Sequence, residues 1–133
     1  MVEGVSHVTL MVKDLDRTAQ LFTEVFGGKE VYSSGGQQFS IAREKFFLVG
    51  GQWIAIMEGE SGVNRSYEHV AFQIKEEDYD FYENQIARLN LECKPGRPRV
   101  EGEGKSLYFY DFDNHLFELH TGTLAQRLEL YRK

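Results

Sequence analysis

One order of strand and helix signals occurs twice in this chain, and this duplication limits the fold more than any other feature. Four residue types of the first copy recur 62 positions further along, where His7, Val8, Lys13 and Asp16 return as His69, Val70, Lys75 and Asp78. A short module with one helix cannot bury its apolar face alone, so it must pair with another. The duplication therefore predicts an α+β fold in which paired βαβββ modules form a concave mixed sheet.

The first module is predicted to span residues 1–60. Its opening segment, 5–12, alternates as a strand does. An acidic turn with Asp14 or Asp16 as the cap, and apolar residues at helical spacing, predict a helix that ends at Gly27 and Gly28. Strand-like pieces follow at about 29–33, 37–42 and 46–57, with breaks at 33–36, 43–45 and 50–51.

The second module is predicted to span residues 65–125, and residues 126–133 form a C-terminal tail. The alternating segment 67–75 is its opening strand, and an apolar stripe predicts a helix at about 77–89. The remaining strands are expected near 90–93, 105–111 and 115–121.

Three side chains are predicted to lie on the sheet face that the helices leave free. Period-two alternation turns a set of apolar residues toward the helices, namely Val8, Leu10, Val12, Val70, Phe72 and Ile74. His7 and His69 then share the opposite face. In the last strand Glu118 has this orientation too, and its counterpart in the first module is Ala55. Two imidazoles and one carboxylate would leave coordination positions open, as a catalytic metal requires.

Other interpretations of these side chains stay open at this point. A single strand histidine is more often a structural or surface residue than a ligand, and a single Glu118 is a plausible edge carboxylate. His120, two residues after Glu118, is a rival ligand or an outer partner of the metal site. Imidazole and carboxylate without thiolate suit Mn²⁺, Fe²⁺ or Zn²⁺.

Charge and cysteine content exclude several classes of partner and of site. The formal charge of −6 is spread along 133 residues, which disfavours binding to nucleic acid or to an anionic membrane. The sequence has no long apolar run and no basic leader, so we expect a cytoplasmic protein. The one cysteine, Cys93, fits a reducing compartment and argues against a thiolate zinc site.

An anion site is suggested by the segment 97–106, where Arg97, Arg99 and Lys105 stand among glycines. Glycine allows the backbone to approach an anion closely. In the following strand Ser106, Tyr108 and Tyr110 share a face, so hydroxyl groups would line the same cavity. A solvated basic turn followed by a half-buried strand explains these residues equally well.

Four segments carry a resemblance to a known family. They are Gly-Val-Ser-His-Val-Thr-Leu at 4–10, Arg-Glu-Lys-Phe-Phe-Leu at 43–48, Arg-Pro-Arg-Val-Glu-Gly-Glu-Gly-Lys-Ser at 97–106, and Tyr-Phe-Tyr-Asp-Phe-Asp-Asn-His-Leu-Phe-Glu-Leu-His at 108–120. Together they resemble the fosfomycin resistance hydrolases of the FosX type, a branch of the vicinal oxygen chelate (glyoxalase) superfamily. The resemblance covers nearly the whole chain.

This resemblance implies an activity, a metal and an assembly. It implies that the chain hydrates the epoxide of fosfomycin to a diol, with Mn²⁺ as Lewis acid, as a domain-swapped homodimer. His7, His69 and Glu118 match the metal ligands and Glu44 matches the general base. The matching substrate-pocket positions are Thr9, Trp53, Tyr67, Ser106, Tyr108 and Arg127. A basic residue of the 94–105 loop is expected to assist, without one being singled out.

Two alternative functions share this inventory. One is the addition of glutathione or a similar thiol to fosfomycin, which uses the same metal and pocket but no protein base; Glu44 favours water over it. The other is a non-catalytic drug-binding protein of the same fold, and the complete set of His7, His69 and Glu118 argues against that.

Overall fold

The chain forms two compact units, Met1–Val63 and Asn64–Lys133, and each is described here by itself. The computed structural model describes residues 1–35, 42–95 and 100–132. Within those ranges no helix has the length and apolar character needed to cross a bilayer. Both units contain one four-stranded mixed sheet, built in the same strand order.

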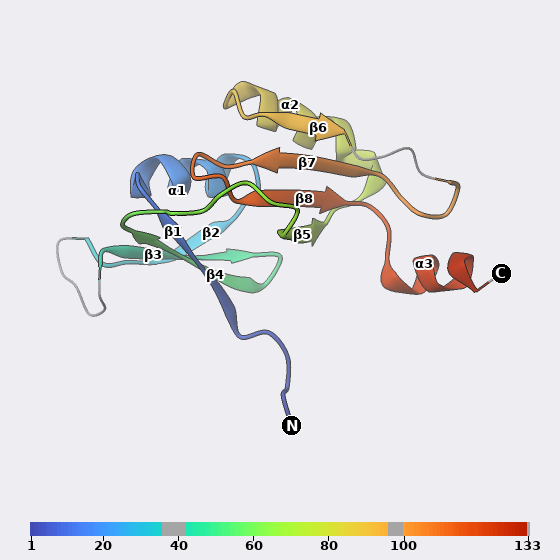
Figure 1. The fold of residues 1–133 in the computed structure, drawn as a ribbon, viewed down its shortest axis with the longest axis horizontal. Helices are drawn as coiled ribbons and strands as arrows, with labels where there is room; N and C mark the ends of the chain where they lie inside the picture. The colour runs from blue at the N-terminus through green and yellow to red at the C-terminus, as the bar shows by residue number, and fades with distance from the viewer. Residues whose placement is uncertain (36–41, 96–99, 133) are drawn as a thin grey trace. The chain divides into compact units, whose positions relative to one another are not determined.

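The first unit has the predicted strand-helix-strand-strand-strand order. Its elements are β1 (His7–Val12), α1 (Leu15–Glu24), β2 (Lys29–Ser33), β3 (Glu44–Val49) and β4 (Gln52–Glu58). The strands lie in the order β1-β4-β3-β2, as Figure 1 shows, with β1 parallel to β4 and the other neighbours antiparallel. Because a helix separates β1 from the other three strands in sequence, β1 can reach β4 as a parallel neighbour.

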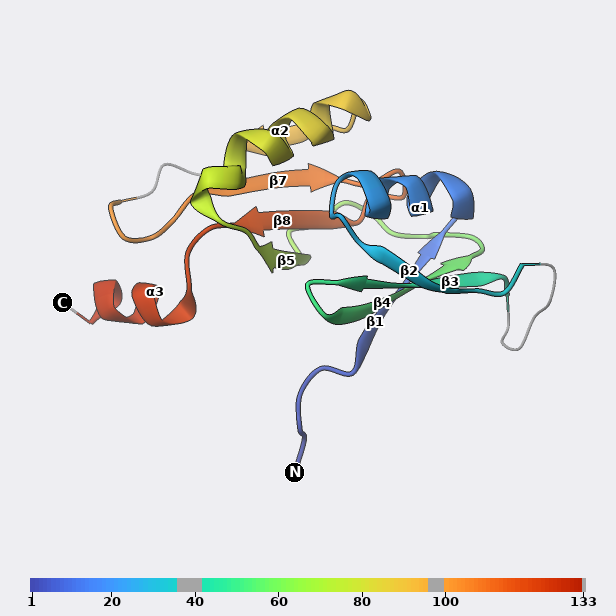
Figure 2. The ribbon, with the colours of Figure 1, turned by 180° about the vertical axis from the view of Figure 1, so that it is seen from behind.

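Helix α1 forms the core of this unit with one face of the sheet, as seen in Figure 2. Asp14 caps the helix by accepting a hydrogen bond from the Arg17 backbone N–H at 3.0 Å. Phe22 of α1 is fully buried and lies 5.3 Å from Phe47 of β3, measured between ring centroids. Burying such a side chain contributes about 1.5–3 kcal/mol relative to leaving it exposed. The apolar spacing of the helix therefore fixes which sheet face is covered.

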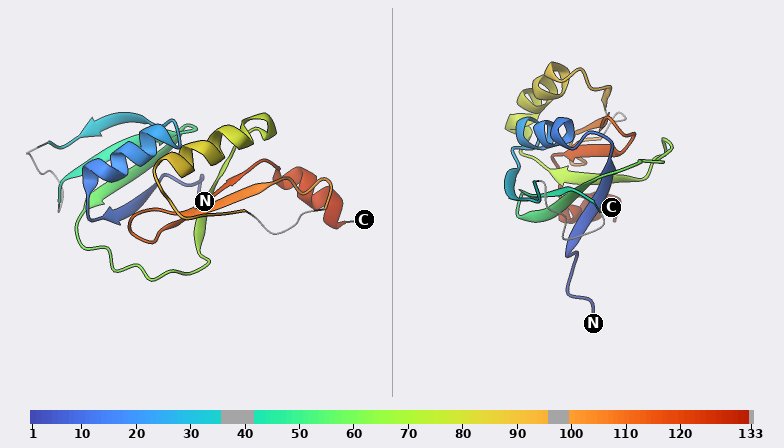
Figure 3. Two further views of the ribbon diagram at one scale, coloured as in Figure 1. Left: turned by 90° about the horizontal axis from the view of Figure 1, so that it is seen from above. Right: turned by 90° about the vertical axis from the view of Figure 1, so that its left-hand side faces the viewer.

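The second unit repeats this arrangement and adds a C-terminal helix. Its elements are β5 (His69–Gln73), the 3₁₀ turn η1 (Glu76–Asp78), α2 (Tyr79–Arg88), β6 (Cys93–Pro95), β7 (Ser106–Tyr110), β8 (Leu116–His120) and α3 (Leu124–Tyr131). The strand order is β5-β8-β7-β6, with β5 parallel to β8. Figure 3 shows α2 running alongside its strands, and α2 contacts β6.

Strand register confirms the predicted equivalence between Ala55 and Glu118. Thr9 of β1 pairs with Ala55 of β4, and Ala71 of β5 pairs with Glu118 of β8. Thr9 and Ala71 are themselves 62 positions apart. The same register relates Glu44, paired with Met57, to Ser106, paired with His120.

The predicted division of the two sheet faces is confirmed by burial. In β1, His7 and Thr9 are exposed while Val8 and Leu10 are partly covered. In β5, exposed and partly covered residues alternate in the same way. Each unit therefore has one sheet face under a helix and another, carrying the histidines, that its own helix leaves free.

The structure corrects three boundaries. Residues 43–45 were expected as a break, but Glu44 and Lys45 open β3. The Glu44 carbonyl accepts from the Ser34 backbone N–H, and the Glu44 N–H donates to the Ser34 hydroxyl, each at 3.0 Å. The strand expected at 90–93 is β6, Cys93–Pro95, since Asn90 has a positive φ of 55° and ends the turn after α2. The helix expected at 77–89 begins as the turn η1 and becomes α-helical at Tyr79. Of the piece expected at 37–42, residues 37–41 lie outside the described residues.

Most of the predicted C-terminal tail belongs to helix α3. Thr123 and Gln126 form a reciprocal capping box, in which the Gln126 N–H donates to the Thr123 hydroxyl and the Thr123 N–H donates to the Gln126 side chain. None of the α3 residues is buried in the unit, and Leu124 is 72% exposed. The helix therefore depends on its polar contacts to hold its place after β8.

Candidate functional site

On the free sheet face of the first unit, His7 and Trp53 form a stacked pair. The two residues are register partners on β1 and β4, and their ring centroids are 4.1 Å apart. Nδ1 of His7 lies 3.0 Å from the Ser6 hydroxyl. The buried indole N–H of Trp53 has no hydrogen-bond partner among the described residues. This face thus offers an oriented imidazole and an unused donor side by side.

Glu44 lies on the same face, at the start of β3, and is only 8% exposed. Its carboxylate makes no hydrogen bond or ion pair within the described part of the chain. The two neighbouring cations are engaged elsewhere: Arg43 pairs with Glu58 at 3.3 Å and Lys45 with Glu30 at 3.0 Å. Glu44 is therefore a largely enclosed carboxylate with its acceptor oxygens available, and not an exposed turn residue.

In the second unit His69 and Glu118 form the centre of a polar cluster. Nε2 of His69 lies 2.9 Å from Oε1 of Glu118, and Nδ1 of His69 lies 2.6 Å from the backbone oxygen of Tyr67. The Tyr67 hydroxyl lies 3.0 Å from that of Tyr108, which is the register partner of Glu118. Residues of the three neighbouring strands β5, β8 and β7, together with Tyr67 in the segment before β5, thus contribute to one cluster.

The Glu118 carboxylate is held in its ionised form. Burial acts to raise its pKa, but hydrogen bonds from Ser106 and Tyr108, together with the nearby His120 and His69, outweigh burial and bring the pKa below its usual value. The Ser106 hydroxyl donates to Oε2 at 2.5 Å. Burial and the bond to Tyr67 raise the pKa of the Tyr108 phenol, which therefore stays protonated. The cluster presents a charged carboxylate surrounded by donors.

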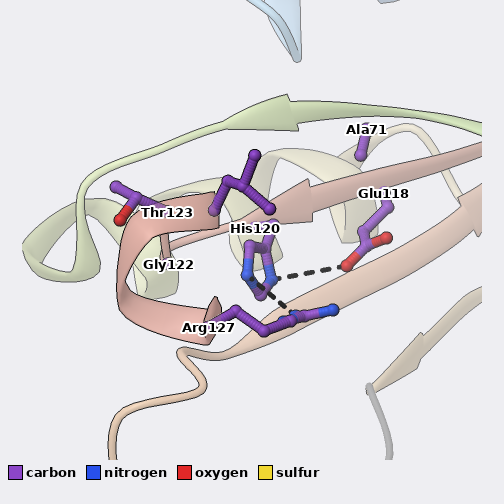
Figure 4. Close-up of a pocket in the computed structure, with 7 residues that line it drawn as sticks. Ala71, Glu118, His120, Gly122, Thr123 and Arg127 are labelled. Atoms are coloured by element: carbon purple, nitrogen blue, oxygen red, sulfur yellow. Dashed lines mark hydrogen bonds and ion pairs between the residues drawn. The ribbon is translucent and has the colours of Figure 1, made fainter. Parts of the chain in front are cut away.

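A cavity of about 240 Å³ opens beside this carboxylate, and Figure 4 shows its lining. The lining residues are Ala71, Glu118, His120, Gly122, Thr123, Leu124 and Arg127. Nη2 of Arg127 lies 3.3 Å from Nε2 of His120, and Nδ1 of His120 lies 2.7 Å from the Ser106 hydroxyl. A guanidinium, which is always charged, therefore borders the cavity next to an anionic group.

Glycine is required where the end of β8 meets the preceding loop. A Cβ at Gly122 would come within 2.8 Å of the Glu103 backbone oxygen and 2.9 Å of Nε2 of His120. A Cβ at Gly104 would in turn lie 2.6 Å from the backbone nitrogen of Gly122, and Gly104 has a positive φ of 84°. The two glycines let these loops touch and leave room around the His120 ring.

Hydrogen-bond chemistry shows that the His69–Glu118 pair fits a cation. The Tyr67 carbonyl oxygen only accepts, so Nδ1 of His69 carries a proton. Nε2 faces a carboxylate oxygen, which also only accepts. The two atoms are stable at 2.9 Å only with a positive charge at that point, either a proton on Nε2 or a metal ion bound by both. One imidazole and one carboxylate suit a divalent first-row metal.

The structure brings most predicted site residues into two groups, one in each unit. His7, Thr9, Glu44 and Trp53 share the free face of the first sheet, while Tyr67, His69, Ser106, Tyr108, Glu118 and Arg127 form or border the cluster of the second. Within the described ranges no three His, Cys, Asp or Glu side chains gather as a metal site. The convergence of His7 with His69 and Glu118 joins both units and stays a prediction. Arg97 and Arg99 lie outside the described residues.

Sequence reasoning missed part of the cavity wall. Ala71, Thr123 and Leu124 line it, and the contact between His120 and Arg127 was not expected. A signal was present in the sequence, because Thr123 and Gln126 have capping-box spacing and place a helix start directly after β8. That start puts Arg127 in the first turns of the helix, close to the end of the strand.

Comparison with protein families gives a match along most of the chain. Residues 4–119 match the Glyoxalase/Bleomycin resistance protein/Dioxygenase superfamily. The repeated mixed sheet with histidines on its free face agrees with this match.

Individual relatives cover the whole sequence. The chain is 56% identical over 133 residues to the fosfomycin resistance protein FosX of Listeria monocytogenes, covering 100% of both. It is 37% identical over 138 residues to the metallothiol transferase FosB of Shouchella clausii, covering 100% of this chain and 90% of that one. A crystal structure of a FosX variant from Listeria monocytogenes, complexed with Mn(II) and 1S,2S-dihydroxypropylphosphonic acid, has a TM-score of 0.90 and 57% identity, covering 97% of this chain and 99% of that one.

Proposed function

Because the chain belongs to the Glyoxalase/Bleomycin resistance protein/Dioxygenase superfamily, and within it to the FosX type of fosfomycin resistance protein, we propose that it inactivates fosfomycin by adding water to the epoxide. The observation that carries the proposal is Glu44, a nearly buried carboxylate without an ion-pair partner among the described residues. The diol phosphonate bound in the related FosX structure is the product that hydration of fosfomycin would give.

We propose that His7, His69 and Glu118 hold the metal, which is Mn²⁺ by comparison with the related FosX structure. When bound, this ion supplies Lewis acidity at the oxirane oxygen. The chain itself prepares the site: the Tyr67 carbonyl fixes the His69 ring so that Nε2 faces Glu118, and Ser106 and Tyr108 keep the carboxylate ionised.

Glu44 is proposed as the general base. It takes a proton from water while the water oxygen forms a bond to an oxirane carbon. As this bond forms, the carbon–oxygen bond of the ring at the same carbon breaks, and the released oxygen gains a proton to complete the diol. A positioned base of this kind contributes about 10²–10⁴-fold to the rate.

The phosphonate is proposed to bind at the cation and hydroxyl groups of the cluster. Arg127 borders the cavity beside Glu118, and a guanidinium recognises phosphonate oxygens through two parallel N–H groups. The remaining pocket contacts proposed are Thr9, Trp53, Tyr67, Ser106 and Tyr108. Because the whole chain is acidic, its affinity for an anion depends on a few local cations.

We further propose a cytoplasmic homodimer with domain-swapped modules. The outer strands of the two described sheets are β1 and β2, and β5 and β6. Open sheet edges are stable when another strand pairs with them. A partner copy would complete the sheets and bring ligands of both kinds of module to each site.

Phosphorus NMR of fosfomycin incubated with the protein and Mn²⁺, with and without glutathione or bacillithiol, tests the reaction. The diol should appear at the same rate in both samples and disappear after chelation. A product that forms only with thiol would assign the chain to the metallothiol transferase activity instead. An unchanged fosfomycin signal in both samples would favour the non-catalytic drug-binding protein.

A further inference from the structure

His120 occupies a position that metal and substrate chemistry do not by themselves explain. It follows Glu118 on the same strand face and is paired in register with Ser106. Both ring nitrogens are engaged: Nε2 lies 3.3 Å from Nη2 of Arg127, and Nδ1 lies 2.7 Å from the Ser106 hydroxyl and 3.4 Å from Oε2 of Glu118. Figure 4 shows the ring between the carboxylate and the guanidinium.

The direction of each hydrogen bond in this series of side chains follows from which atoms can donate. A guanidinium only donates, so Nε2 of His120 accepts from Arg127. Nδ1 of His120 faces the Ser106 oxygen and donates to it. Ser106 in turn gives its single hydroxyl proton to Glu118. Four side chains thus form one directed relay from a fixed cation to the carboxylate.

We propose that His120 is a positioning residue that joins the anion-binding Arg127 to the metal-binding Glu118. It orients the guanidinium through Nε2 and, through Nδ1 and Ser106, holds the carboxylate in the rotamer that faces His69. This inference rests on the proposed function for the roles of Arg127 and Glu118. It assigns His120 to neither the metal nor the substrate, because its two nitrogens already serve its neighbours.

Two substitutions separate the two halves of the relay. His120→Asn places an amide nitrogen near the position of Nδ1, so it keeps a donor for Ser106 and loses the acceptor for Arg127. His120→Gln is one methylene longer and places an amide oxygen near the position of Nε2, so it keeps the acceptor and loses the donor. His120→Ala removes both, and His115→Asn is the matched control, since His115 bonds Asp111 at 2.7 Å and not Glu118.

The readouts are Mn²⁺ affinity, from electron paramagnetic resonance of free Mn²⁺ without drug, and the KM and kcat for fosfomycin. His120→Ala should lower Mn²⁺ affinity by ~10-fold or more, the usual effect of losing an outer partner of a ligand. His120→Asn should keep the Mn²⁺ affinity within about threefold of the parent, a smaller change than the loss of one hydrogen bond causes. It should nevertheless raise the KM for fosfomycin as His120→Ala does. His120→Gln should show the reverse, with KM near the parent and Mn²⁺ affinity lowered.

This crossed pattern distinguishes positioning from a purely structural role or a ligand role. Equal losses in both readouts for Asn and Gln would mean that the ring only fills space. Mn²⁺ affinity as low in His120→Asn as in His120→Ala would make His120 a ligand, and no change in any variant would remove it from the site. All three results overturn the inference. If the parent protein hydrates no fosfomycin, the proposed function fails, while the Mn²⁺ readout still decides the His120 to Glu118 half of the relay.

Discussion

Glu44→Gln should have opposite effects on activity and on stability, because it should slow hydration without weakening the fold. The variant keeps the size and hydrogen-bonding capacity of the side chain and removes only its ability to accept a proton. We expect kcat for fosfomycin hydration to fall by ~10²–10⁴. This range corresponds to about 2.7–5.4 kcal/mol of barrier height, since each factor of ten is about 1.36 kcal/mol. Affinity for Mn²⁺ should change little, because Glu44 is not among the proposed ligands.

The free energy of unfolding of Glu44→Gln should be equal to that of the parent protein or higher. The hydrogen bonds between Glu44 and Ser34 use only the backbone atoms of Glu44, so the variant retains them. The carboxylate itself has no ion-pair partner within the described residues and is 8% exposed. Replacing an unpaired, largely buried charge by a neutral amide therefore removes a desolvation penalty without removing a contact.

The assay is single-turnover phosphorus NMR or a discontinuous measurement of diol, alongside urea unfolding of both proteins. Glu30→Gln is the control, because Glu30 is an exposed carboxylate of the same sheet that pairs with Lys45. It should leave kcat near the parent value. Near-parent hydration by Glu44→Gln would falsify the base assignment, and a loss of activity matched by a loss of stability would make Glu44 a structural residue.

Four further predictions follow from the same geometry. Arg127→Ala should raise the KM for fosfomycin at least ~10-fold in steady-state assays, in line with the loss of a charge-assisted bidentate contact. Arg132 is an exposed arginine next to the same helix, so Arg132→Ala should leave KM unchanged. Gly122→Ala should lower the free energy of unfolding by about 1–3 kcal/mol in urea titrations, as overpacking does, because its Cβ would lie 2.8 Å from a backbone oxygen; unchanged stability would contradict the close approach. Burial acts to lower the pKa of His115, but the hydrogen bond and charge interaction with Asp111 outweigh burial and raise the pKa above 6.5. The resulting stabilisation is complete below about pH 6.5 and is lost as pH rises through the raised pKa. His115→Asn should therefore flatten the dependence of the unfolding free energy on pH in this window. Light scattering at micromolar protein should give a dimer, and an active monomer would refute the proposed assembly.

The free sheet face was predictable because strand alternation is a purely local property. Once His7 and Val8 alternate, the same pattern at His69 and Val70 fixes both faces, and the register between Ala71 and Glu118 follows from the repeat. Helix α1 was equally accessible, because its cap and its apolar spacing lie within a few residues of each other.

Other features depended on contacts that local sequence does not encode. Arg43, Glu44 and Lys45 have the composition of a turn, yet β4 and the Ser34 hydroxyl bond to the backbone here and extend the strand through Glu44. The contact between His120 and Arg127 requires β8 and α3 to be placed in three dimensions. The proposed convergence of His7 with Glu118 depends on pairing between modules, which neither module's own sequence pattern encodes.

The equivalence of Glu44 with Ser106, and of Ala55 with Glu118, has a consequence for the ancestry of the chain. The two halves differ at the same two sheet positions, where one half carries the proposed base and the other the proposed carboxylate ligand. A symmetric protein built from two copies of the first half would have a base and no acidic ligand. One built from two copies of the second half would have the proposed acidic ligand twice and lack the base. If Glu44 and Glu118 have the proposed roles, hydration requires both halves of the duplication, because neither half alone supplies both carboxylates.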